Sequence, residues 1–132
     1  MATRAMEPTA NQHTWDMLIV APIGEASDLA HGIRASLVEH GLRVKLDVVS
    51  EQRLLPLPAS CTDDAKRARF CMVLGMIGTT IHFALMPAPK CPGQVPDIAP
   101  IGTRAAPGQV EIGPLTEGLS ELAARIESLL RG

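Results

Sequence analysis

The sequence predicts an α/β protein, a three-layer sandwich around a mixed, mostly parallel sheet of about five strands. Two observations predict this class. The first half of the chain alternates short apolar runs with a segment of helical periodicity, and the second half adds two apolar runs and a final amphipathic helix. The chain of 132 residues has the size of one domain. We place this domain at residues 16–132, after a flexible tail at residues 1–15.

The first elements are a strand, a helix and a second strand. Residues 17–21 form a continuous apolar run that ends at Pro22, which is typical of a strand buried on both faces. Apolar side chains then recur at helical spacing as far as Leu37, and Gly41 stands where a helix-ending residue with positive φ is expected. Residues 42–49 form the second strand, and the loop lengths indicate parallel pairing with the first.

The rest of the chain contains one long irregular segment between predicted elements. It is a Pro-rich insertion at about residues 87–107, because prolines exclude regular helix and central strand. The other expected elements are a short helix that Thr62 caps, strands at residues 70–74 and 79–86, an edge strand at residues 110–112 and a helix that begins near Pro114.

The uncharged run at residues 70–89 is long enough for a membrane helix. Glycine, threonine and histidine interrupt it, so two buried strands joined by a turn explain it better, and we expect no membrane association. The N-terminus has no apolar signal segment, and Cys61, Cys71 and Cys91 lack the spacing of metal ligands. We therefore expect an intracellular protein, either cytoplasmic or mitochondrial.

Composition narrows the function classes. The net charge of −2 argues against a protein that binds nucleic acid over its whole surface, and three aromatic residues are too few for a multi-base stacking platform. No Ser or Cys stands in a nucleophile pattern, and the histidines are not at metal-ligand spacing. We therefore expect no catalytic residues, no metal site and no cofactor.

The turn between the first strand and the first helix offers backbone N–H groups at the carboxyl edge of the sheet. Pro22, Ile23 and Gly24 form this turn, and such a turn can bind an anion. Asp47 stands where a ribose-binding acid stands in dinucleotide folds, but the Gly-rich nucleotide pattern is absent. A tight turn is the simpler interpretation, and a small nucleotide-binding flavodoxin-like protein is the weakest of our hypotheses.

Basic residues are concentrated around the second strand and the approach to the third. If these elements are neighbours, the cations can contact several phosphates despite the acidic total. The alternative is a solvated rim that Glu51, Asp63 and Asp64 neutralise. The basic residues in question are Arg43, Lys45, Arg53, Lys66, Arg67 and Arg69.

Short motifs also follow one another in an informative order. They are LIVAPIG at 18–24, LVEHGLRVKLD at 37–47, SEQR at 50–53, RARFCMVLG at 67–75, Gly-Thr at 78–79 and Gly-Gln-Val at 108–110. Together they resemble the anticodon-binding domain of class II aminoacyl-tRNA synthetases, over about residues 16–130. The resemblance implies that domain's fold, standing alone without a synthetase catalytic core.

The resemblance also implies RNA recognition, in which Glu51 and Arg53 match the family's RNA-facing loop and Arg43 and Arg67 support phosphates. Three departures weigh against it. Residues 54–58 replace a basic helix of the family, Arg69 stands at a proline position, and the basic residue of the family's fourth strand is absent.

Our leading hypothesis is a non-catalytic RNA-binding module of the tRNA anticodon type, a subunit of a translation or ribonucleoprotein complex. The second hypothesis is a protein–protein interaction or dimerisation module, including a homodimer, that keeps the fold but has lost RNA binding. The candidate RNA contacts are Arg43, Glu51, Arg53, Lys66, Arg67 and Arg69, with the backbone of Pro22, Ile23 and Gly24.

Overall fold

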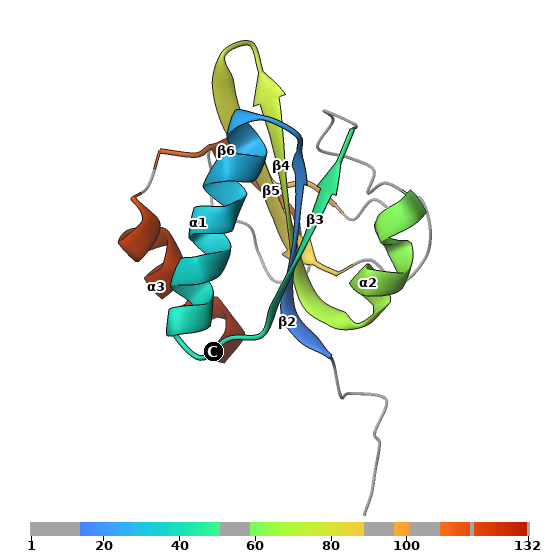
Figure 1. Ribbon diagram of the computed structural model, residues 1–132, viewed down its shortest axis with the longest axis vertical. Helices are drawn as coiled ribbons and strands as arrows, with labels where there is room; N and C mark the ends of the chain where they lie inside the picture. The colour runs from blue at the N-terminus through green and yellow to red at the C-terminus, as the bar shows by residue number, and fades with distance from the viewer. Residues whose placement is uncertain (1–13, 51–58, 89–96, 101–108, 117, 132) are drawn as a thin grey trace, which may run out of the picture.

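The computed structural model describes residues 14–50, 59–88, 97–100, 109–116 and 118–131 (Figure 1). Glu51, Arg53, the N-terminal tail and most of the Pro-rich insertion therefore lie outside the described residues. The elements are strands β2 (Trp15–Pro22), β3 (Val44–Val49), β4 (Ala68–Ile77), β5 (Thr80–Pro87) and β6 (Glu111–Pro114), helices α1 (Glu25–Glu39), α2 (Thr62–Lys66) and α3 (Leu119–Arg131), and a 3-10 turn at Ala59–Cys61.

The strands form one mixed sheet in the order β3-β2-β4-β5-β6. β2 pairs in parallel with β3 and β4, whereas β5 pairs antiparallel with β4 and β6. The α/β class and the mixed five-stranded sheet are thus confirmed. Antiparallel pairs are as numerous as parallel ones among the described strands, however, so "mostly parallel" is corrected. The reason is that β4 returns directly into β5 through a tight turn at Gly78, where φ is +64°.

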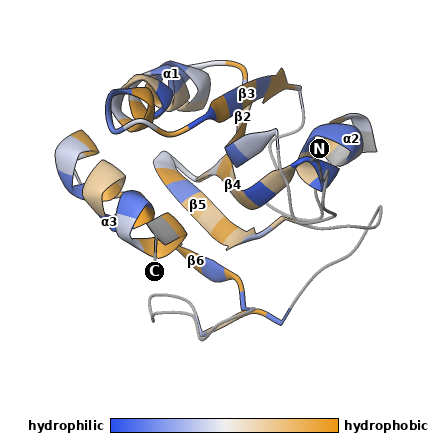
Figure 2. Ribbon diagram, turned by 90° about the horizontal axis from the view of Figure 1, so that it is seen from below, coloured by the Kyte–Doolittle hydropathy of each residue, from blue (hydrophilic) through white to orange (hydrophobic). Residues whose placement is uncertain are grey.

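Three layers are visible along the sheet, with α1 and α3 on one face and α2 on the other (Figure 2). Strand alternation explains the two cores. In β2, Met17 and Ile19 are buried against the face that α1 and α3 cover, whereas Leu18 and Val20 are buried in the cluster beside α2. Because β2 is central and covered on both faces, its continuous apolar run in the sequence is explained.

The predicted strands within residues 70–89 are confirmed, since this run forms most of β4 and all of β5. No helix in the part of the chain that the structure describes is long and apolar enough to cross a membrane. Gly41 also has the expected positive φ, +83°, directly after the helix end.

Two predicted helix starts are wrong. α3 begins at Leu119, because Pro114 ends β6 instead, opposite His82 of β5. Thr62 is the first residue of α2 rather than its cap; Cys61 holds the N-cap position and makes no side-chain cap bond. The first of these boundaries depends on the pairing of Pro114 with His82, which is far away in the sequence.

Candidate nucleic-acid interface

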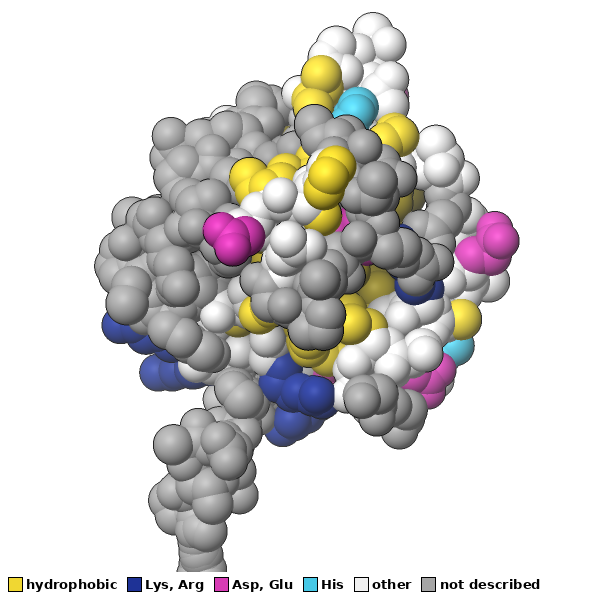
Figure 3. Space-filling model, turned by 180° about the vertical axis from the view of Figure 1, so that it is seen from behind, with side chains coloured by type: hydrophobic (Ala, Val, Ile, Leu, Met, Phe, Trp, Pro, Cys, Tyr) yellow, Lys and Arg dark blue, Asp and Glu magenta, His cyan; other side chains and the backbone are white. Residues whose placement is uncertain are grey.

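Four of the predicted cations meet at one end of the sheet, where the parallel strands β2, β3 and β4 begin. The backbone N–H of Trp15 donates to the carbonyl of Arg67 at 2.9 Å, and that of Asp16 donates to the carbonyl of Arg43 at 2.8 Å. The start of β2 therefore joins the residue before β3 to the residue before β4. In Figure 3, Lys and Arg side chains gather at the lower end of the molecule, the end at which β2 begins. We call Arg43, Lys66, Arg67 and Arg69 the basic end.

Asp16 anchors the basic end. Its carboxylate accepts a hydrogen bond from the backbone N–H of Arg43 at 2.9 Å and forms an ion pair with the Arg43 guanidinium at 3.4 Å. Burial by itself would raise the pKa of Asp16. The hydrogen bonds from Arg43 and the charges of Arg43 and Arg69 outweigh burial, so the pKa of Asp16 lies below its usual value of 3.8. Asp16 stays ionised and holds Arg43 in a defined position.

The other three cations differ in how firmly they are held. Arg69 donates from its guanidinium to the carbonyl of Leu130 at 2.8 Å, which satisfies an acceptor in the last turn of α3. Lys66, in the last turn of α2, and Arg67, directly after it, are exposed. The basic end thus consists of four exposed cations, two of which, Arg43 and Arg69, are also bonded to the protein.

The turn at Pro22, Ile23 and Gly24 lies at the opposite end of the same strand. Six residues separate Asp16 from Pro22, which is about 20 Å of extended strand. The structure therefore does not bring the turn together with the basic end. Glu51 and Arg53 follow the carboxyl end of β3, but their placement lies outside the described residues.

Hydrogen bonds within the protein already occupy N–H groups of this turn. The N–H of Ile23 donates to the carbonyl of Val49 at 3.0 Å, and the N–H of Gly24 donates to Oγ of Ser27 at 3.1 Å. Glu25 and Asp28 also place acidic side chains in the first turn of α1. Negative charge at a helix N-terminus competes with a bound anion for the same partial positive charge.

Aliphatic side chains are exposed at the carboxyl end of the parallel strands. Ile23 is 70% exposed, Val48 in β3 is 46% exposed and Ile77, at the end of β4, is 55% exposed. We call these three residues the apolar end. The two ends of the parallel strands thus present opposite surface chemistry, cationic at one end and aliphatic at the other.

Asp47 lies near the carboxyl end of β3 and faces α2. It precedes the last two residues of β3, and its carboxyl is close to Asp64 of α2 and to the Cys61 thiol. Burial, followed by the hydrogen bond and the charge of Asp64, raises the pKa of Asp47 to about 6.

The two described cysteines are buried and lie in the core beside α2. Burial, with the nearby charge of Asp47, raises the pKa of the Cys61 thiol to about 11, and burial raises the pKa of Cys71 even more strongly. A thiol with such a pKa is protonated near neutral pH and is a poor nucleophile. Neither group therefore has the properties of an activated thiol.

Comparison of the chain with protein-family models, curated proteins and solved structures gave no match. The resemblance to anticodon-binding domains therefore remains a prediction from the motifs.

Sequence reasoning did not find Asp16 as the anchor of the basic end. The bond from Arg43 joins residues 27 positions apart, and no local pattern in the sequence reports such a pair.

Proposed function

We propose that this protein is a non-catalytic RNA-binding module and that the basic end contacts RNA phosphates. The observation that carries the proposal is the convergence of Arg43 with the segment 66–69 around the start of β2. Phosphates recognise cations through charge and bidentate hydrogen bonds, and fixed guanidinium groups are suited to both. The motif order along the chain supports RNA of the tRNA type, and the five-stranded mixed sheet agrees with the fold that the resemblance implies.

The acidic net charge of the chain does not oppose this interface. Of the acidic residues nearest to it, Asp16 is paired with Arg43, while Asp63 and Asp64 form no ion pair with Lys66 or Arg67 in the part of the chain that the structure describes. Salt screens charges beyond about 8–10 Å, so a local group of cations determines local binding. Subunits of translation or ribonucleoprotein complexes require this kind of local phosphate contact.

Arg67→Glu tests the proposal most simply, because Arg67 is exposed. Binding of bulk tRNA can be followed by the fluorescence of Trp15, the single tryptophan, whose backbone N–H donates to the carbonyl of Arg67. We expect Arg67→Glu to weaken binding by about fivefold or more at low salt and to reduce the salt slope by about 0.7–0.9.

The matched control is the double variant Ile77→Glu/Thr79→Glu, which changes the net charge by the same amount at the other end of the sheet. Both of its side chains are exposed. We expect it to bind tRNA nearly as well as the unaltered chain. Equal losses in the two variants would mean that only net charge matters, and unchanged binding in Arg67→Glu would overturn the proposal.

One observation favours the second hypothesis, a protein–protein interaction module. The apolar end exposes three aliphatic side chains, including Ile77 at the tip of the β4–β5 hairpin. Aliphatic side chains that remain exposed are candidates for contact with another protein. A photo-crosslinking residue at position 77 is then expected to capture protein in cells, and one at position 67 is expected to capture RNA. Protein capture at both positions would favour the interaction module over the RNA module.

A further inference from the structure

We propose that two copies of this chain pair through the free edge of β3, in antiparallel register centred on Leu46, to form one continuous sheet. This inference is independent of the RNA proposal, because it uses none of the cations of the basic end. It is argued from the hydrogen-bonding groups of β3, from the charges along it and from the facing side of α1.

β3 is a terminal strand of the sheet, so one side of its backbone has no strand partner among the described residues. The carbonyls of Arg43 and Val49 accept bonds from β2 residues and their neighbours, and they therefore face inward. Strand alternation then directs the N–H and C=O groups of Val44, Leu46 and Val48 outward. The Val44 carbonyl confirms this direction, because it accepts a long bond, 3.4 Å, from Nε of Arg34 on α1.

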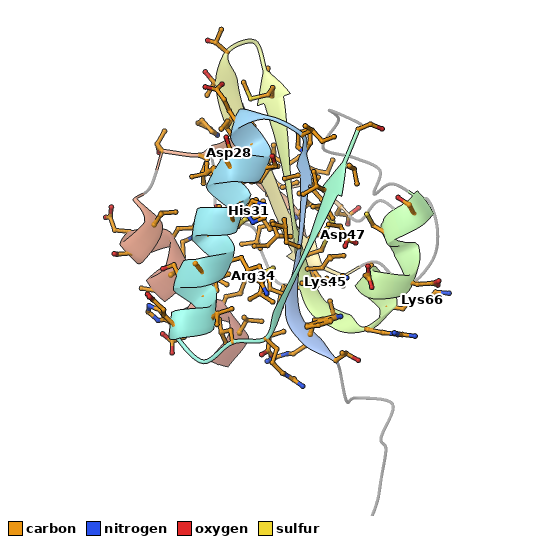
Figure 4. All side chains as sticks on the ribbon, in the orientation of Figure 1. Asp28, His31, Arg34, Lys45, Asp47 and Lys66 are labelled. Carbon is orange, nitrogen blue, oxygen red and sulfur yellow. The ribbon has the colours of Figure 1, made fainter. Side chains whose placement is uncertain are left out.

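An open depression of about 390 Å³ follows this edge. Val48 is 46% exposed there, although it lies on the sheet face that is otherwise covered by α1. In Figure 4 β3 lies in front of β2, so the view looks onto this edge. The residues that line the depression are Trp15, His31, Arg34, Val44, Lys45, Leu46 and Val48.

The sequence of β3 is self-complementary in one antiparallel register. When Leu46 faces Leu46 of the second copy, Val44 faces Val48, and all three outward residues form hydrogen-bonded pairs. Lys45 then faces Asp47 of the second copy in the closer, non-hydrogen-bonded pairs. Within one chain these two side chains are already 3.9 Å apart, so the dimer joins four charges of alternating sign.

Neighbouring registers lack this complementarity. A shift that centres the pairing on Lys45 places two lysines opposite each other, and a shift that centres it on Asp47 places two aspartates opposite each other. Like charges directly opposite destabilise a strand pair. The charges of β3 therefore select the register centred on Leu46.

Helix α1 lies beside this edge. The bond from Arg34 to the Val44 carbonyl shows that Arg34 reaches the outer side of β3. His31 and Arg34 line the depression, on the side of α1 that faces β3 (Figure 4). Asp28 lies about 120° further around the helix than Arg34, opposite the buried Ala30 and Ile33, and is exposed.

The spacing of the layers leaves room for two copies of α1 beside the paired strands. α1 packs on both β2 and β3, so its axis lies about one strand spacing, roughly 5 Å, from the axis of symmetry. Two copies of α1 would then be about 10 Å apart, the usual distance between packed helices. The resulting sheet would have its two basic ends pointing in opposite directions, so each copy would retain its own RNA surface.

A charge-swap series on the full chain tests this interface by sedimentation equilibrium. We expect the unaltered chain to dimerise with rising concentration and Lys45→Asp to raise the dissociation constant about tenfold or more, because two attractive pairs become repulsive. The double variant Lys45→Asp/Asp47→Lys restores opposite charges and is expected to return to within about threefold of the unaltered chain. A chain that remains monomeric at all concentrations, or a double variant no better than the single one, would overturn the proposal.

A second measurement protects the test against folding defects in β3. Amide exchange gives the register directly: the N–H groups of Leu46 and Val48 should become protected only as concentration rises, whereas those of Lys45 and Asp47 should be protected throughout. Failure of tRNA binding would leave these results unaffected.

Discussion

The two ends of the parallel strands are built from the same three strands but present different chemistry. At the amino end, the backbone of β2 joins Arg43 to Arg67, and Asp16 holds the Arg43 guanidinium. At the carboxyl end, the N–H groups of Ile23 and Gly24 are bonded within the protein and the exposed side chains are aliphatic. A strand–helix turn whose position suits anion binding can therefore have its N–H groups bonded by its own neighbours. The cationic surface then lies elsewhere.

The largest expected effect is at the anchor of the basic end. Asp16→Ala leaves the N–H of Arg43 without its acceptor and frees the guanidinium, so we expect a loss of about 2 kcal/mol in the free energy of unfolding. Urea denaturation measures this loss. The exposed acid Asp63 provides the control, since Asp63→Ala should stay within about 0.5 kcal/mol.

The pH dependence of this effect has a defined sign. Because the folded state lowers the pKa of Asp16, its stabilisation is present above the unfolded value of 3.8 and is lost as pH falls through the lower folded value. The difference between the unaltered chain and Asp16→Ala should therefore shrink in acid below pH 3.8. A difference that grows in acid would contradict the account.

The next prediction tests whether the turn at Pro22, Ile23 and Gly24 takes part in RNA binding. Gly24 has φ +124° and ψ −144°, a conformation that side chains rarely adopt, and an added Cβ there would meet no atom within 4 Å. Gly24→Ala should therefore cost about 1–2 kcal/mol through backbone strain alone, whereas Gly113→Ala should cost less, since its Cβ would make only an ordinary contact with Phe83. Thermal unfolding measures both. We expect tRNA affinity of the folded Gly24→Ala protein to be unchanged; a loss would place the turn in the interface.

The smallest expected effect concerns Asp47 and Asp64, whose carboxyl groups lie close together. The pKa of Asp47 is raised from 3.8 to about 6, so its contribution to stability is fully present below pH 3.8 and is lost as pH rises through 6. Asp64→Asn removes the repulsion and should raise the stability at pH 7 by about 1 kcal/mol, after allowance for solvent screening. It should also reduce the change in the free energy of unfolding between pH 4 and 6. Asp63→Asn, in the same turn, should change neither the stability at pH 7 nor its pH dependence. Identical pH dependence in the two variants would disprove the coupling between Asp47 and Asp64.

The sequence predicts the order of the elements because each depends on local patterns. The apolar run at residues 17–21 and the helical spacing up to Leu37 identify β2 and α1 without reference to the rest of the chain. The start of α3 could not be predicted in this way. Pro114 suits the first turn of a helix, but pairing of residues 111–114 with β5 places it in a strand.

The candidate site could be predicted only in part. The concentration of cations around residues 43 and 66–69 in the sequence corresponds to a real cluster in space, since β3 and β4 both flank β2. The sequence does not separate the turn at residues 22–24 from these cations, although the turn follows β2 and the cations lie at or just before the starts of β3 and β4. In parallel strands these positions lie at opposite ends of the sheet, so topology rather than composition decides the grouping.

Salt titration of tRNA binding by the unaltered chain tests the central claim, that the basic end contacts RNA phosphates, most directly. Four cations that each displace a counterion predict micromolar or tighter binding at low salt and a log–log slope of roughly −3. Absence of binding at low salt, or binding that salt does not weaken, would contradict the account and favour the protein-interaction module.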